Sequence, residues 1–222
     1  MMKSMEAAEE KIKELEASLN EKISLLKEVY HRVKNNFQVI ISLINLQIES
    51  IDNPLAKKIL IESNTRIKAM VLVHEMLYQS ANLAEIEMQA YINDLLRYPI
   101  DAYSINDDQI KLVVHVDPIF LPLDEAILCG LIINELITNA IKYAFPLGKK
   151  GQITVSLKSL NHTVKISVSD NGIGLSDSFN IDSNKTLGMR LIINLAKQLG
   201  GDLVVKNDHG ACFTINFMRT IK

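Results

Sequence analysis

The sequence predicts an α+β protein in which an N-terminal pair of long helices is followed by a two-layer sandwich of helices on a sheet. Two observations lead to this fold class. Apolar residues recur every three or four positions through the first ~80 residues, which is typical of amphipathic helices. After Ala81, short alternating runs typical of strands are interleaved with helical segments. Hydrophobic residues make up 48% and charged residues 23% of the chain, as in globular proteins.

The first predicted helix runs from about Met5 to Ser50 and carries a heptad pattern. Apolar residues occupy its a and d positions at Ile12, Leu15, Leu19, Leu26, Val29, Val33, Ile40 and Leu43. In this register His31 is an f residue, on the side of the helix farthest from the apolar seam. We expect residues 1–24 to form a coiled-coil helix.

Asn53 and Pro54 predict the start of a second helix, because asparagine caps helices well and proline suits their first turn. This helix is expected to end near Tyr78, and its apolar stripe consists of Leu60, Ile67, Met70, His74 and Leu77. Two helices joined by a tight turn leave apolar faces uncovered. We therefore expect residues 25–82 to pair with a second copy as the four-helix bundle of a homodimer.

Residues 83–222 are expected to form the sandwich domain. The sequence predicts helices over residues 89–98, 122–145 and 186–199, and strands over residues 111–116, 153–157, 164–169, 203–205 and 211–217. Turns are expected at Asn161-His162 and at Asp208-His209-Gly210, and Gly200-Gly201 is expected to end the last helix.

Three polar residues interrupt the otherwise apolar helix at 122–145. Glu135, Asn139 and Lys142 are spaced by four and then three residues, so they share one helix face. Buried polar groups are costly unless they are satisfied, and two explanations are open. The stripe is either a structural polar network or one wall of a cavity for a metal-bound polyphosphate. In the second case Asn139 offers an oxygen ligand for Mg²⁺ and Lys142 a charge for phosphate.

Two glycine-containing motifs follow. The segment DNGIGL at 170–175 comes directly after a predicted strand, where Asp170 can accept a hydrogen bond and the glycines permit close backbone approach. The segment LGMRLI at 187–192 places Gly188 at a helix start, where free backbone N–H groups attract anions. Each motif alone fits an ordinary turn or helix cap. The order of all three motifs is far more specific.

In this order the motifs resemble the ATP-binding domain shared by sensor histidine kinases, gyrase and MutL. ELITNAIKYAF resembles its N box, DNGIGL its first glycine box and TLGMRLI its second. HRVKNNFQVI resembles the phosphoacceptor H box of two-component sensor kinases, in the subfamily with HRxxNN. RIKAMVLVHEMLYQS is similar to the second dimerisation helix of that subfamily. The resemblance spans roughly residues 25–217.

The resemblance implies roles for the matching residues. Asn139 would ligate Mg²⁺, Lys142 would contact phosphate, Asp170 would bind the adenine amine, and Glu135 would polarise the nucleophile. The remaining residues expected at the nucleotide lie in the same boxes: Tyr143, Gly172, Gly174, Thr186, Leu187 and Gly188.

In the H box, His31 would be the phosphoacceptor, and Arg32, Lys34 and Asn35 are expected to contact the phosphoryl group or a partner. Three features depart from the commonest pattern of this family. Arg32 stands where an acidic residue is common, Thr186 replaces the first glycine of the second glycine box, and the segment 176–185 is short for a lid over ATP.

The predicted function is an ATP- and Mg²⁺-dependent protein-histidine kinase that phosphorylates His31 and then an Asp of a response-regulator receiver domain. An unperturbed imidazole suits this chemistry, because it is largely neutral near pH 7. Two alternatives are open. One is a kinase or ATPase that acts on other residues, although such proteins lack the H box. The other is a dimeric scaffold with a degenerate ATP site, against which the complete set of motif residues argues.

Composition bears on partners and location. The net charge of −2 gives no pull toward nucleic acid. The two cysteines, Cys129 and Cys212, lack metal-binding spacing. The most apolar run, 126–141, is too short to span a bilayer. We therefore expect no transmembrane segment and a cytoplasmic location, either for this chain alone or as the cytoplasmic portion of a longer sensor.

Overall fold

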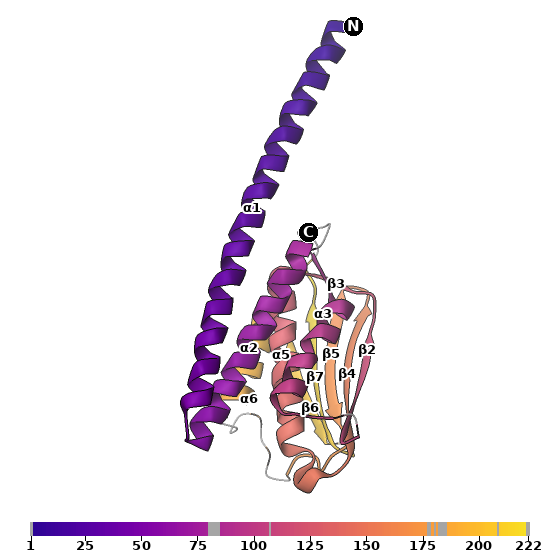
Figure 1. The fold of residues 1–222 in the computed structure, drawn as a ribbon. Helices are drawn as coiled ribbons and strands as arrows, with labels where there is room; N and C mark the ends of the chain where they lie inside the picture. The colour runs from indigo at the N-terminus through magenta and orange to yellow at the C-terminus, as the bar shows by residue number, and fades with distance from the viewer. Residues whose placement is uncertain are drawn as a thin grey trace.

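The computed structural model describes residues 2–79, 85–106, 108–176, 179, 181, 186–207 and 209–220. A helical hairpin stands beside a layered domain in which helices cover one face of a sheet (Figure 1). The N-terminal half of the first helix extends well beyond the rest of the molecule. This is the predicted α+β architecture, with the αα-hairpin preceding the sandwich.

The hairpin consists of α1, Met2–Ser50, and α2, Pro54–Gln79. The turn between them forms because the Asn53 side-chain oxygen accepts hydrogen bonds from the backbone N–H groups of Leu55 at 3.0 Å and Ala56 at 3.1 Å. These bonds satisfy two of the N–H groups that the start of α2 leaves without helical partners. The predicted cap at Asn53 is confirmed.

A five-stranded sheet in the order β2-β4-β5-β7-β6 forms the second layer of the domain. Its strands are β2 Ile110–Val116, β4 Gly151–Leu160, β5 Thr163–Asp170, β6 Asp202–Asn207 and β7 Ala211–Met218. The pair β2–β4 is parallel and the other pairs are antiparallel. Inward side chains of β4, β5 and β7 alternate with outward ones, so one face is buried and one is open.

The helical layer positions the candidate site. Its helices are α3 Met88–Leu95, α4 Arg97–Ala102, α5 Leu123–Tyr143 and α6 Leu187–Gln198, and a 3-10 turn covers Pro146–Gly148. Helix α5 lies between α2 and the sheet (Figure 1). The hydrophobic core is continuous from Ala69, Val73 and Leu77 of α2 to the inner residues of the sheet. One face of α2 is thus part of the core of the sandwich domain.

The structure differs from the sequence expectations in detail. The helix expected over 89–98 is two helices, α3 and α4, which meet at Leu96. Pro99 explains the break, because proline has no N–H to bond the carbonyl four residues earlier and its ring clashes there. A small sheet of β1, Glu85–Glu87, and β3, Phe120–Pro122, was not predicted. The expected boundary at 82–83 and most of the short segment 176–185 lie outside the described residues.

Helix α5 is long and apolar enough to cross a membrane by length and composition, with a mean hydropathy of 1.3, but 67% of that stretch is buried inside the domain.

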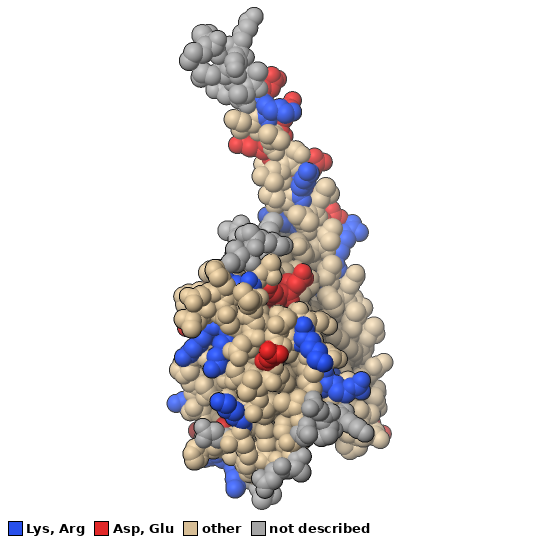
Figure 2. All heavy atoms as spheres, turned by 180° about the vertical axis from the view of Figure 1, so that it is seen from behind, with Lys and Arg blue, Asp and Glu red and all other residues tan. Residues whose placement is uncertain are grey.

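Figure 2 shows the molecule from behind, where Lys and Arg residues of the domain are scattered among uncharged ones. Along the protruding part of α1, basic and acidic residues are mixed. This view shows no extended basic surface among the described residues.

Candidate active site

A cavity of about 330 Å³ opens beside α5, between the end of β5 and the start of α6. Asn139, Asp170, Gly174 and Thr186 line it together with Tyr143. Most of the remaining wall is apolar, and includes Leu136, Ala140, Val168, Met189 and Phe213. An apolar pocket of this size with a few convergent polar groups is typical of a small-molecule site. The structure thus brings together residues from all three predicted nucleotide motifs.

The Asp170 carboxylate is fixed at the end of β5. Its Oδ1 accepts hydrogen bonds from the backbone N–H groups of Gly172 at 2.9 Å and Ala211 at 3.3 Å. The loop after it is held by Asn207, whose Oδ1 accepts from Leu175 N at 3.0 Å and whose Nδ2 donates to Leu175 O at 2.9 Å. Asn207 was missed by the sequence analysis, because its role depends on the pairing of β6 beside the loop.

The start of α6 is placed by Thr186 and Gly188. The Thr186 hydroxyl accepts a hydrogen bond from Met189 N at 3.4 Å, so threonine at this position caps α6. A Cβ atom at Gly188 would lie 2.9 Å from Glu135 Oε2 and 3.8 Å from Asn139 Oδ1. Glycine therefore allows the second glycine box to approach the N box closely. Leu187 is 64% exposed and, like Gly172, does not line the cavity.

The polar stripe of α5 is divided between two environments, so each of the two explanations left open by the sequence fits part of it. Asn139 lines the pocket, whereas Glu135 and Lys142 turn toward α2. Arg66 donates from Nε to Glu135 Oε1 at 2.6 Å and from Nη2 to Oε2 at 2.9 Å. Lys142 Nζ donates to Glu62 Oε1 at 2.6 Å.

Burial makes these contacts with α2 consequential. The exposed side-chain fractions are 4% for Glu135, 10% for Lys142, 14% for Arg66 and 19% for Glu62. The hydrogen bond to Glu135 raises the pKa of Arg66 above its usual value. The pKa of Tyr103, at the end of α4, is raised mainly by burial and further by the nearby charges of Glu62 and Glu135. Removing one partner of such a buried pair typically costs about 3–5 kcal/mol, because the other charge is left uncompensated.

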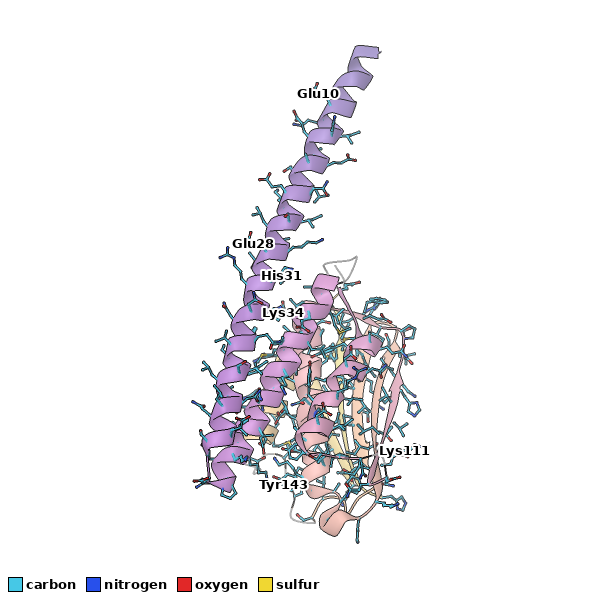
Figure 3. The ribbon with its side chains drawn as sticks, viewed as in Figure 1. Glu10, Glu28, His31, Lys34, Lys111 and Tyr143 are labelled. Atoms are coloured by element: carbon cyan, nitrogen blue, oxygen red, sulfur yellow. The ribbon has the colours of Figure 1, made fainter. Side chains whose placement is uncertain are left out.

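The H-box residues lie on α1, where His31 is exposed (Figure 3). Arg32 pairs with Glu28 one turn earlier, at 2.6 Å, and Lys34 pairs with Glu75 of α2 at 2.9 Å. Asn35 is exposed.

His74 packs between two aromatic rings of α1, with its ring centroid 6.4 Å from those of Tyr30 and Phe37. The expected packed position of His74 is confirmed, but its buried Nδ1 has no hydrogen-bond partner among the described residues.

The two halves of the candidate site lie far apart in this arrangement. In Figure 3, His31 is beside the upper part of α2, whereas Tyr143 lies near the lower end of α5. Lys34, three residues after His31, pairs with Glu75, whereas Lys142 pairs with Glu62. Glu62 and Glu75 are 13 positions apart on α2, which corresponds to roughly 20 Å of helix at 1.5 Å per residue. A phosphoryl group held near Lys142 would not reach His31 without a domain movement.

The residues present suit a magnesium-bound nucleotide. The apolar wall can cover a base, and the fixed Asp170 carboxylate at that wall can accept from an exocyclic amine. The Asn139 amide oxygen is a hard ligand of the kind that Mg²⁺ takes alongside phosphate oxygens. Lys142 lies one turn of α5 beyond Asn139, where its ammonium group could meet a phosphate.

Comparison with known proteins finds two family models that match this chain. A family model described as "Histidine kinase" matches residues 28–103, and one described as "Histidine kinase-, DNA gyrase B-, and HSP90-like ATPase" matches residues 124–221. The sensor histidine kinase PdtaS of Mycobacterium tuberculosis is 29% identical over 198 residues, which cover 88% of this chain and 39% of that protein. The chain thus spans well under half of this relative.

Two further relatives come from Erythrobacter litoralis. Its blue-light-activated histidine kinase 2 is 26% identical over 193 residues, or 81% of this chain and 52% of that protein. The solved histidine kinase domain of a blue-light-activated kinase superposes with a TM-score of 0.64 at 25% identity, and covers 86% of this chain and 91% of that domain. Because two family models that name histidine kinases match residues 28–103 and 124–221, which together are most of the chain, the chain belongs to the histidine kinase family.

Proposed function

We propose that this chain is the core of a two-component sensor histidine kinase, which transfers the γ-phosphoryl group of ATP to His31 and then to an Asp of a response-regulator receiver domain. One observation carries the proposal. A single chain holds an exposed histidine on a long helix and a pocket that collects Asn139, Asp170 and the glycine boxes. The family match to an ATP-binding domain supports ATP as the substrate.

In the proposed reaction a ring nitrogen of His31 attacks the γ-phosphorus. The N–P bond forms as the bond to the oxygen bridging the β- and γ-phosphorus breaks, ADP leaves, and the imidazole proton passes to solvent or to a carboxylate. Asn139 would orient Mg²⁺, which supplies charge neutralisation at the phosphates, and Lys142 would add a positive charge there. Glu135 would act on the nucleophile only when it is released from Arg66. The phosphoramidate then passes its phosphoryl group to the Asp carboxylate of the regulator.

We propose the same division of the chain as the sequence predicts. Residues 1–24 form the signalling helix, residues 25–82 the dimerisation and phosphotransfer domain, and residues 83–222 the ATP-binding domain. The exposed α1 surface around Arg32 and Asn35 supports recognition of the regulator there, with Lys34 contributing after it leaves Glu75. We place the second copy of the chain along the apolar seam of α1.

Incubation with γ-labelled ATP and Mg²⁺ tests the proposal. The chain should acquire label that is lost in acid and kept in base, as expected of a phosphoramidate. His31→Gln should abolish the label and leave nucleotide binding unchanged, because His31 lies outside the pocket. Asn139→Ala should abolish labelling by removing the Mg²⁺ ligand. Persistent labelling of His31→Gln would place the phosphoacceptor elsewhere, and normal labelling of Asn139→Ala would exclude the metal role.

A further inference from the structure

Four largely buried charges join α2 to α5, and we call them the α2 latch: Glu62 and Arg66 of α2 with Glu135 and Lys142 of α5. They form a chain of alternating sign. Lys142 contacts Glu62 at 2.6 Å, Glu62 contacts Arg66 at 3.9 Å, and Arg66 contacts Glu135 at 2.6 Å. Two carboxylates and two cations leave the latch without net charge. Each charge of the latch is therefore paired within it. An added anion that binds one of the two cations must displace a carboxylate of the latch.

The two α5 members of the latch are the residues that the proposed reaction needs. Lys142 is the expected phosphate contact and Glu135 the expected acidic group, yet α2 engages both. Thr138 lies on the same helix face, three residues after Glu135 and four before Lys142. Its buried hydroxyl has no hydrogen-bond partner among the described residues. This part of the α2–α5 contact is therefore polar and incompletely satisfied.

The neighbouring part of the α2 contact is different. Ala69 and Val73 are fully buried in the continuous core, and the Tyr91 hydroxyl donates to Ala69 O at 3.1 Å. This apolar part holds no residue of the nucleotide motifs. An anion that competes with Glu62 would break the ion pairs of the latch. The apolar contacts of Ala69 and Val73 would then still hold α2 on the sandwich domain.

We infer that the α2 latch is an autoinhibitory contact, in which the Glu62 carboxylate occupies the position at Lys142 that a nucleotide phosphate takes. The inference rests on the proposed ATP site. With the latch formed, Lys142 is paired with Glu62 and Glu135 is paired with Arg66. The pocket then lies roughly 20 Å from His31 along the axis of α2. Nucleotide binding and docking on α2 thus oppose each other.

The coupling is reciprocal. If the latch weakens nucleotide binding, then nucleotide must weaken the latch by the same factor. A Mg²⁺-nucleotide carries more negative charge than the single Glu62 carboxylate, so it is the stronger partner for Lys142. Nucleotide binding therefore weakens the contact between the ATP-binding domain and α2, so that the domain can move toward His31. Without nucleotide, the domain stays docked on α2.

Equilibrium binding of the trinitrophenyl derivative of ATP, measured by fluorescence on the whole chain with Mg²⁺, tests the latch. Glu62→Gln keeps the shape of the side chain and removes the competing charge. We expect its Kd to fall by about threefold or more, because the fraction of competent molecules rises. Glu62→Ala should bind at least as tightly as Glu62→Gln. Thermal unfolding of each variant checks that the fold is intact.

Glu75→Gln is the matched control. Glu75 lies on the same helix with 24% of its side chain exposed, against 19% for Glu62, and its ion pair is with Lys34 of α1. Its Kd should equal that of the unchanged chain. Equal Kd values for Glu62→Gln and Glu75→Gln, or weaker binding by Glu62→Gln, would overturn the latch and leave the proposed kinase function standing. Failure of every form to bind the probe in a manner reversed by ATP would overturn both.

Discussion

At the scale of single residues, Gly188 shows how tightly the motifs are fitted to one another. The place of its missing side chain is 2.9 Å from a carboxylate oxygen of Glu135, and Arg66 holds that carboxylate with two hydrogen bonds. The carboxylate cannot move away without breaking a buried ion pair. The residue of one motif therefore limits which residue another motif can carry.

Gly188→Ala is expected to destabilise the domain by about 1–3 kcal/mol, as is usual when a methyl group is forced into a packed site. The Kd for a fluorescent ATP analogue should also rise, because α6 and Thr186 are displaced from the pocket. Thermal unfolding and a binding titration measure the two effects. Asn194→Ala, at an exposed position of α6, serves as control. An unfolding midpoint of Gly188→Ala equal to that of the control would contradict the close approach.

Sequence reasoning placed Asn139, Asp170 and Gly174 at one pocket, because their motifs have local spacing and a fixed order. It could not place Glu62 and Arg66, which contact residues 80 and 69 positions away. Four residues apart on α2, they look like an ordinary solvated ion pair of a helix surface. Only the packing of α2 on α5 buries them. The same packing divided the α5 stripe, so helical spacing correctly put its residues on one side but could not tell which neighbour each would meet.

At the scale of elements, the pairing of α1 with α2 encloses His74 between Tyr30 and Phe37. Burial lowers the pKa of His74 from the usual 6.5, so the folded hairpin favours the neutral ring. The unfolded chain then binds more protons than the folded chain just below pH 6.5, and stability decreases as the pH falls through that window. The free energy of unfolding should accordingly be lower in mild acid than at neutral pH.

His74→Gln removes this titration, so the variant should lose less stability than the unchanged chain when the pH is lowered from about 7.5 to about 5.5. Unfolding midpoints measured at both pH values give the comparison. His115→Gln replaces a histidine exposed on β2 and should keep the pH dependence of the unchanged chain. The same midpoint shift in the His74 and His115 variants would show that His74 does not govern the effect.

Among the elements, the long ones were predictable and the short ones were not. Helical periodicity over many residues and the Asn53-Pro54 signal defined the hairpin, and Asn161 adopts the positive φ of 56° that suits its predicted turn. The strands β1 and β3 have three residues each, too few for an alternating pattern to be distinguished. The break at Leu96 was missed because the apolar periodicity continues through it, although Pro99 was a visible signal.

At the scale of the whole molecule, the apolar seam of α1 is uncovered. Its predicted a and d residues are largely solvent-exposed in the single chain: Ile12, Leu15, Leu19, Leu26, Val29, Ile40 and Leu43. Helix α2 offers the sandwich domain one face and α1 another, so it covers only part of α1. A helix of 49 residues, about 74 Å long, with an exposed apolar stripe is typical of a coiled coil that awaits a partner.

Leu43→Asp combined with Val29→Asp should convert the proposed dimer into a monomer, because a carboxylate at a heptad seam cannot be buried without a partner. Sedimentation equilibrium at micromolar concentration measures the change. Leu160→Asp alters an apolar residue that is 76% exposed at the tip of β4 and should leave the dimer intact. A monomeric unchanged chain, or a double variant that remains dimeric, would exclude association through α1.

The outer strands of the sheet bear on how molecules of this chain meet. Strands β2 and β6 are the two edges, and their unpaired backbone groups could template the addition of a foreign strand. Exposed Lys111 and His115 on β2, and Asp202 and Lys206 on β6, bring charge or a polar ring to these rims. Such gatekeepers discourage amyloid-like stacking. The sheet edges are therefore poorly suited to association between molecules, in contrast to the exposed apolar seam of α1.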